Sequence, residues 1–318
     1  MTALVVALTG CQRPSPVQPH TVLVSDEQAN VLHVIDGATL RETGRIPVGR
    51  RPRGLGFAPG GVPLYVAASN DNRIEAVNPK SGAVERRLAS GPDPERFAVS
   101  PDGRTLYVAN EDDGVVSFLD VASGRLRGAA TVGPEPEGMA VSPDGRWVVC
   151  TSEAASLVHF IDAASGRLVD SVLVGARPRD ARFGRAGRRL WVTSESRASV
   201  AVFDVASRKV LHTVDLRAAL PRPQMQAVGL AISPDGSRVY VGLGRGDGVA
   251  EIDAASFRVL RDFKAGRRIW GIALSPDGRR LYAAGGLSAD LTAIDLVTGR
   301  TVRVLKLGGR PWGVVTAP

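Results

Sequence analysis

The stretch SPDGRTLYVANEDDGVVSFLDVASGR, residues 100–125, decides the fold. It reads as a tight turn (SPDG), a short apolar run (TLYVAN), a polar loop (NEDDG), an alternating run (VVSFLD) and a second turn (VASG). Proline presets φ and glycine accepts a positive φ, so both turns suit antiparallel hairpins. The stretch therefore predicts short antiparallel strands that follow one another through the sheet.

The same pattern recurs through the chain. SPDG begins at residues 100, 142, 233 and 275, and the intervals are 42, 91 and 42 residues. A turn-forming residue marks an equivalent point of each repeat, at Asp36, Asn78, Asp120, Asp162, Asp204, Asp253 and Asp295. These positions are 42 apart, except for 49 between Asp204 and Asp253, and the extra residues fall in LRAALPRPQMQ, 216–226. Four short antiparallel strands in about 42 residues are typical of one β-propeller blade.

Counting the repeats gives seven blades. Six full units begin near residues 54, 97, 138, 181, 229 and 271, and a seventh first strand, GVVTAP, ends at Pro318. The three strands that complete it lie at the other end, in HTVLVS, NVLHVID and RETGRIPV. We therefore expect one all-β domain over residues 21–318, a seven-bladed β-propeller with four antiparallel strands per blade. Its last blade is closed by one C-terminal and three N-terminal strands, which leaves no half-blade with open edges.

The first twenty residues have a different character. The apolar run ALVVALTGC is too short to span a bilayer as a helix. Its end, residues 8–11, resembles the lipobox of bacterial lipoproteins, in which the cysteine is lipidated and becomes the new N-terminus. The resemblance implies lipidation at Cys11, a signal segment over residues 1–11 and a periplasmic, membrane-anchored protein. QRPSPVQPH, 12–20, is typical of a proline-rich tether.

The formal net charge is +8, and the arginines that produce it are scattered rather than clustered. This charge is compatible with an anionic partner such as nucleic acid, lipid head groups or an acidic protein, and equally with a generic basic surface. Cys150, in the strand-like run RWVVCTS, reads as a small buried apolar residue. Its context differs so much from that of Cys11 that we expect no disulfide between them.

LYVAN, with SPDG before it and DVASG after it, resembles the YVTN family of seven-bladed propellers. Four stretches are similar to the β-propeller proteins associated with PQQ-dependent catabolism: residues 90–124, 133–153 (GPEPEGMAVSPDGRWVVCTSE), 159–162 (HFID) and 309–315 (GRPWGVV). That resemblance implies a periplasmic setting. It also implies quinoprotein alcohol dehydrogenases, their cytochromes and an ABC-type export system as partners.

In a propeller the first strand of each blade lines the central channel, and the connection from the previous blade enters it at one face. GPEPEG (133–138), GPDPER (91–96) and GRRPRG (49–54) are such connections, here called hub segments. The residues nearest the strand are Arg53, Glu95, Glu137, Arg179, Val228, Trp270 and Trp312. Two positions earlier lie Arg51, Asp93, Glu135, Arg177, Gln226, Arg268 and Arg310. A proline stands between them in most copies and fixes an extended backbone.

These columns predict two stacked rings around the channel. The predicted ligand- or partner-binding residues are an acidic arc (Asp93, Glu95, Glu135, Glu137), flanking arginines (Arg51, Arg53, Arg177, Arg179) and an opposed aromatic pair (Trp270, Trp312). The alternative is that self-neutralising ion pairs plug the channel and the tryptophans pack on neighbouring blades. The insertion at 216–226 belongs to the same kind of connection, so we expect it to rise over the same face.

No catalytic set stands out. The four histidines lack metal-ligand spacing, and the chain has no nucleophile elbow, P-loop or dinucleotide fingerprint. NEDDG, 110–114, could bind Ca²⁺ or form a solvated turn. We expect a monomeric binding or accessory protein without cofactor or metal. Two alternatives stay open: a lactonase- or lyase-like enzyme that uses Glu95 or Glu137 as general base, and a nucleic-acid-binding propeller, which the scarcity of aromatic residues disfavours.

Overall fold

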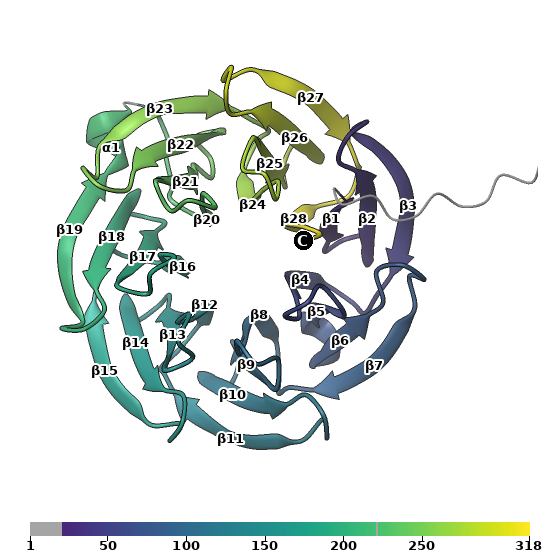
Figure 1. Cartoon of the computed structure of the whole chain (residues 1–318), viewed down its shortest axis with the longest axis vertical. Coiled ribbons are helices and arrows are strands. Elements are labelled where there is room, and N and C mark those ends of the chain that lie inside the picture. The colour runs from purple at the N-terminus through teal and green to yellow at the C-terminus, as the bar shows by residue number, and fades with distance from the viewer. Residues whose placement is uncertain (1–20, 221) are drawn as a thin grey trace, which may run out of the picture.

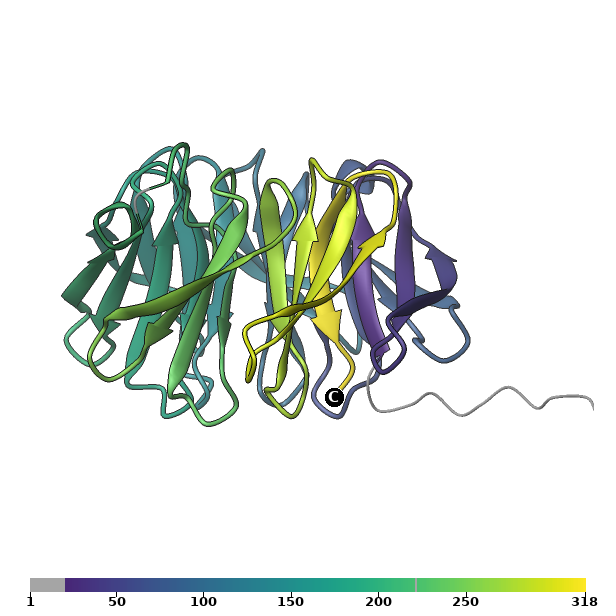
Figure 2. The ribbon, with the colours of Figure 1, turned by 90° about the horizontal axis from the view of Figure 1, so that it is seen from above.

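The computed structural model describes residues 21–220 and 222–318, and these form seven four-stranded antiparallel sheets around a central axis (Figure 1). From the side the molecule is a short, wide cylinder (Figure 2). The predicted all-β, seven-bladed fold is confirmed. The predicted lipidation at Cys11 and the tether at 12–20 lie outside the described residues.

Each blade runs outward from the axis in chain order. Blade one contains β4 (Pro52–Phe57), β5 (Leu64–Ala68), β6 (Arg73–Val77) and β7 (Val84–Ala89); blade two contains β8 (Pro94–Val99), β9 (Thr105–Asn110), β10 (Val115–Asp120) and β11 (Leu126–Thr131). Blade three contains β12 (Pro136–Val141), β13 (Trp147–Ser152), β14 (Leu157–Asp162) and β15 (Leu168–Leu173); blade four contains β16 (Pro178–Phe183), β17 (Arg189–Ser194), β18 (Ser199–Asp204) and β19 (Lys209–Asp215). Blade five contains β20 (Leu230–Ile232), β21 (Arg238–Gly242), β22 (Gly248–Asp253) and β23 (Val259–Lys264); blade six contains β24 (Ile269–Leu274), β25 (Arg280–Gly285), β26 (Asp290–Asp295) and β27 (Thr301–Lys306); blade seven contains β28 (Pro311–Thr316), β1 (Thr21–Asp26), β2 (Val31–Asp36) and β3 (Arg41–Pro47).

Blade seven is closed by both ends of the chain, as predicted. β28 pairs with β1 in antiparallel register, with Val24 opposite Val314. The Ser25 hydroxyl donates to the Arg53 carbonyl of blade one (2.8 Å) and accepts the Gly313 N–H of β28 (2.9 Å). One buried side chain therefore ties the N-terminal strand, the C-terminal strand and the next blade together.

The hydrophobic core lies between the blades rather than in one central mass. The second strand of each blade is almost fully buried, whereas the fourth strand, at the rim, is largely exposed. One buried cluster joins Tyr65 and Ile74 of blade one to Leu106 and Val108 of blade two, and six further clusters repeat this arrangement around the ring among the described residues. The channel therefore does not need an apolar filling, and polar side chains can occupy it.

The two ends of the cylinder differ in what they carry. The hub segments and the loops between second and third strands share one end, here called the funnel face, and the Glu111 N–H accordingly donates to the Asp93 carbonyl (3.0 Å). The SPDG turns and the turns between third and fourth strands form the other end, the turn face. There the Ser100 hydroxyl contacts the Asp102 carboxylate at 2.6 Å and holds the turn.

The described part of the insertion at 216–226 begins with a short helix, α1 (Leu216–Ala219), capped by the Asp215 carboxylate. Figure 1 places α1 at the outer rim beside β19 and β23, so this part of the insertion stays away from the axis instead of covering the hub. In the part of the chain that the structure describes, no helix is long and apolar enough to cross a membrane.

Candidate functional site

The hub segments share an unusual backbone conformation. Each hub segment has one residue two positions before the residue nearest the strand. Five of these seven residues have a positive φ: Arg51 (53°), Asp93 (44°), Glu135 (54°), Arg177 (57°) and Arg268 (57°). Such a conformation is uncommon for residues with a side chain. It turns the connection inward just before the strand, and the proline that usually follows fixes the backbone there. The loops after the second strands repeat the same conformation, for example at Asn72, Ser156 and Ala198, so it belongs to the blade repeat and does not by itself mark a site.

Glu95 is the centre of the acidic sector. It is fully buried, and its two carboxylate oxygens face Arg53 Nη1 (2.6 Å) and Arg51 Nη2 (3.1 Å). Arg51 also reaches Asp93 through Nη1 (2.7 Å). On the far side, Arg53 Nε lies 3.1 Å from Glu27, a residue of the loop that follows β1. Three blades are therefore joined by one chain of ion pairs.

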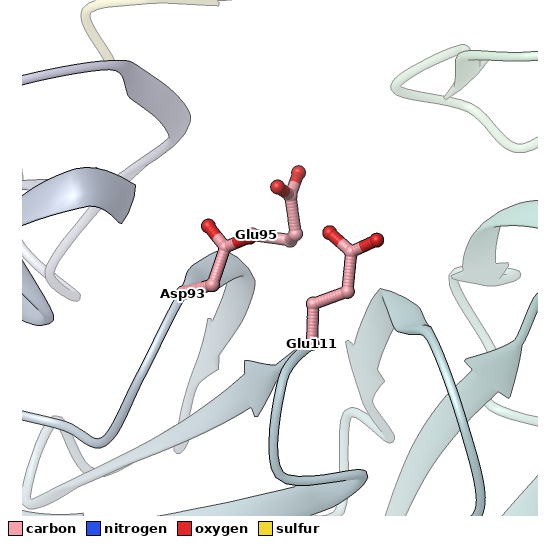
Figure 3. Close-up of side chains that lie close together, drawn as sticks. All are labelled: Asp93, Glu95 and Glu111. Atoms are coloured by element: carbon pink, nitrogen blue, oxygen red, sulfur yellow. The ribbon is translucent and has the colours of Figure 1, made fainter.

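Glu111, from the loop after β9, approaches the same carboxylates, and Figure 3 shows the side chains of Asp93, Glu95 and Glu111 converging. Burial raises the pKa of Glu95 well above its usual value, and the nearby charges of Glu137 and Glu111 add to the effect. Burial also raises the pKa of Glu111, although a hydrogen bond to Glu95 opposes it. The pair therefore holds a proton more firmly than free carboxylates do.

Oxygen atoms of these three carboxylates lie within 4.8 Å of one another, a spacing that a divalent cation could bridge. Arg51 and Arg53 already supply positive charge to Glu95 in this arrangement. The guanidinium groups of Arg51 and Arg53 therefore already balance negative charge of this cluster.

A second network fills the other half of the hub. Arg179 is buried and lies 3.4 Å from Glu137 and 3.6 Å from Glu195, and it also pairs with Glu153. Arg177 contacts Glu153 at 2.5 Å and Glu195 at 3.6 Å, but its side chain remains 50% exposed. Arg177 is thus held at its inner end and open to a partner at its outer end.

The aromatic pair is packed beneath arginines. Trp270 and Trp312 stack with ring centroids 6.3 Å apart and planes inclined by 27°. Arg268 lies 4.1 Å from the centre of the Trp270 ring, and Arg53 lies 5.1 Å from that of Trp312. Cation–π contacts of this kind contribute about 0.5–2 kcal/mol each, depending on burial. Trp312 is buried, whereas Trp270 is partly exposed.

Two residues pair across the channel at the position where the other five blades carry glycine. Arg96 of blade two reaches across to Asp180 of blade four, with Nη1 3.3 Å from Oδ2, and its guanidinium lies 4.7 Å from the centre of the Trp312 ring. Asp180 also accepts the Leu230 N–H of blade five (2.9 Å). The pair passes Gly138, where an added Cβ would lie 2.9 Å from the Asp180 Cα. Nearer the turn face the channel keeps a cavity of about 60 Å³, room for a few water molecules.

The structure brings together nine of the ten predicted site residues, all but Glu135, whose hub contact is made by its carbonyl with the Glu153 N–H (2.8 Å). Although Glu111 lies in NEDDG, considered above for Ca²⁺, the sequence did not identify Arg96, Asp180 or a third ring, made of the first residues of the loops after the second strands. These are Glu27, Ser69, Glu111, Glu153 and Glu195. Their common interval of 42 was the available signal, since equivalent positions of a propeller lie at equal height around the axis.

The fold and the hub together define a seven-bladed β-propeller whose channel is crossed by ion pairs. A family model described as "YNCE-like beta-propeller" matches residues 56–164, from blade one into blade three. No curated protein matches this chain.

Solved structures share the fold over almost the whole chain. The periplasmic gluconolactonase of Pseudomonas aeruginosa is 24% identical, with a TM-score of 0.80 over 94% of this chain and 99% of that one. The hydrazine synthase of Kuenenia stuttgartiensis is 21% identical, with a TM-score of 0.79 over 91% and 99%. A Desulfotomaculum acetoxidans protein of unknown function is 15% identical, with a TM-score of 0.80 over 93% and 98%. At these identities the likeness concerns the fold.

Proposed function

We propose that this chain is a non-catalytic, periplasmic accessory protein of PQQ-dependent alcohol catabolism that binds a partner protein or small ligand at its funnel face. One observation carries the proposal. Five of the seven hub segments keep a proline at the same point, whereas the residues on either side of it differ in charge, and these form a charged site with partly exposed ends, Arg51 and Arg177. A partner would meet groups whose positions are already fixed, which lowers the entropic cost of binding.

The topology agrees with a tethered protein. Thr21 begins β1, a second strand, and second strands start at the turn face. A lipid on Cys11 and a tether over residues 12–20 would therefore attach the propeller by its turn face. The funnel face would then point away from the membrane, toward a quinoprotein dehydrogenase, a cytochrome or a periplasmic part of an ABC-type exporter.

The test uses purified quinoprotein dehydrogenase and cytochrome from the same bacterium, with binding measured by calorimetry. Combined Arg51→Ala, Glu135→Ala and Arg177→Ala should abolish binding of the true partner while the melting temperature falls by only a few degrees. A matched control, Glu85→Ala, Arg104→Ala and Arg188→Ala, alters exposed residues away from the funnel face and should bind as the wild type does. Equal binding by both variants would refute the proposal.

A second candidate is an enzyme acting at the same hub, on a lactone or another small anionic substrate. The observation in its favour is the Glu95–Glu111 pair with its raised pKa, beside two arginines that could hold an anion. Its difficulty is access, because Glu95 is fully buried and Glu137 nearly so. Turnover of gluconolactone that disappears in Glu95→Gln, with the fold intact, would favour this candidate over the accessory role.

A further inference from the structure

A row of exposed arginines crosses the funnel face outside the hub network. Blades four to seven each carry one: Arg197 in the loop after β17, Arg245 in the loop after β21, Arg267 in the hub segment before β24, and Arg310 in the hub segment before β28. Within residues 21–220 and 222–318, no acidic side chain forms an ion pair with any of the four. We call these residues the arginine arc.

The backbone beneath the arc is held firmly at three of its positions. The Arg267 N–H donates to the Ser288 hydroxyl (2.7 Å), the Arg245 N–H to the Gln226 side chain (3.1 Å) and the Arg310 N–H to the Asp26 carboxylate (3.0 Å). The side chains above these anchors are exposed. Fixed positions and uncommitted guanidinium groups are what a charged docking surface requires, since little order has to be imposed when the partner arrives.

The opposite sector of the same face is acidic. Asp112 and Asp113 are exposed in the loop after β9 of blade two, and the partly exposed Asp93 and Glu111 lie beside them. The funnel face is therefore bipolar, with positive charge over blades four to seven and negative charge over blade two. Such a face selects the orientation of a partner as well as its sign of charge.

We propose that the arginine arc is a docking surface for a protein that carries a compact acidic patch. This inference rests on the proposed binding role of the funnel face and names the chemistry of the partner. Complementary charges at a rim mainly accelerate association and fix its orientation. A DNA duplex is stiff and would also have to pass near the acidic loop of blade two, whereas a flexible acidic polypeptide can follow the arc alone, so the bipolar face favours an acidic protein.

The experiment uses poly-L-glutamate as the acidic polypeptide probe and a DNA duplex as the competing polyanion, with Kd measured at low and at physiological ionic strength. The arc variant combines Arg197→Glu, Arg245→Glu, Arg267→Glu and Arg310→Glu. The matched control makes the same change at four exposed arginines of the turn face, Arg104, Arg188, Arg258 and Arg279. Each reversal removes two charges from the formal +8, so both variants have a formal net charge of zero.

We expect poly-L-glutamate to bind the arc variant about tenfold more weakly than the wild type, and the control to change by less than about twofold. Added salt should weaken the wild-type complex steeply and the arc variant's complex little. Equal losses in both variants would show that net charge, not the arc, binds the probe, and would overturn the inference. DNA bound more tightly than poly-L-glutamate, through the same arginines, would overturn it in favour of nucleic acid.

The outcome can be separated from that of the proposed function. The hub variant is the combined Arg51→Ala, Glu135→Ala and Arg177→Ala described above. If the arc variant keeps poly-L-glutamate binding while the hub variant still loses the dehydrogenase or cytochrome, the arc inference fails and the accessory role stands. If the arc variant loses the probe while the hub variant keeps its partner, the basic surface is real and the assignment of partner binding to the hub residues fails.

Discussion

Arg53 and Glu95 lie 42 positions apart in the chain, and Arg53 Nη1 is 2.6 Å from Glu95 Oε2. Because this interval equals one blade, the pair joins equivalent positions on neighbouring blades. The same interval separates Arg51 from Asp93 (2.7 Å) and Arg268 from Gln226 (2.7 Å). The repeat decides which positions meet at the hub, and the divergence between repeats decides their charge. The hub is therefore both a set of links between blades and a site with its own chemistry.

Removing Arg53 should be costly, because Glu95 would keep its burial and lose its shorter ion pair. We expect Arg53→Met to lower the free energy of unfolding by about 3 kcal/mol at neutral pH. Urea denaturation measures this. Glu95→Gln, which removes the buried charge instead, should cost less. A larger decrease of the unfolding free energy in Glu95→Gln than in Arg53→Met would contradict the view that an unpaired buried carboxylate destabilises the fold.

The raised pKa of Glu95 predicts a definite pH dependence. Its usual value is 4.5, and the folded value lies well above it, so the folded state binds more protons between the two. Stability from this group is present at low pH and declines as pH rises from 4.5 through the folded pKa. In Glu95→Gln that decline should be shallower, and Glu111, whose pKa is also raised, should account for the remainder. Unfolding free energies at several values between pH 4.5 and 8 test this, and identical slopes in the two proteins would refute it.

The fold was readable from the sequence because a period of 42 imposes a strict geometry. Each SPDG turn and each apolar run predicted a strand that the structure contains. The facing of hub residues was also readable, since Arg51, Glu95 and Trp312 fall in columns. The pairing of the hub side chains could not be predicted from the sequence. The ion pair between Arg96 of blade two and Asp180 of blade four depends on how far these side chains extend across the channel. The positive φ at Asp93 and Glu135 was hidden too, since glycine usually signals that conformation.

The glycines beside the hub should tolerate no side chain. An added Cβ at Gly271 would lie 2.6 Å from the Trp312 carbonyl, which belongs to the neighbouring blade's first strand. We expect Gly271→Ala to lower the unfolding free energy by about 1–3 kcal/mol. Gly44 on β3 has nothing within 4 Å of an added Cβ, so Gly44→Ala should be neutral or stabilise by about 0.5 kcal/mol. Melting curves compare the two, and equal losses would show that crowding at the hub is not the cause.

Closure of the ring should depend on Ser25. Ser25→Ala removes the donor to the Arg53 carbonyl and the acceptor for the Gly313 N–H, and it leaves both buried backbone groups without this partner. The expected cost is about 2–6 kcal/mol, since each of the two unsatisfied groups costs about 1–3 kcal/mol. Amide exchange should quicken first in β28 and β1. Ser207→Ala, in an exposed turn where the hydroxyl contacts Asp204, should cost less than about 1 kcal/mol. Uniform exchange across all blades would argue against a local seam.

His159 should make the protein sensitive to mild acid. Its Nδ1 lies 2.8 Å from the Ser171 hydroxyl, and burial lowers its pKa from the usual 6.5 to about 4. Between pH 6.5 and 4 this histidine is therefore protonated in the unfolded chain but not in the folded chain, so the free energy of unfolding falls as the pH drops through this range. The full effect is at most about 3 kcal/mol.

His159→Gln should remove that part of the pH dependence, as seen in unfolding free energies at pH 7, 6 and 5. The control is His212→Gln, because His212 is exposed at the rim and stacks on Phe257 with centroids 5.0 Å apart. It removes a histidine at the surface instead of a buried one. This trend opposes that of Glu95, whose contribution grows toward low pH. The double variant of Glu95→Gln and His159→Gln should accordingly show a flatter profile than either single variant, and a steeper profile than that of either single variant would mean that the two groups are coupled through the blades.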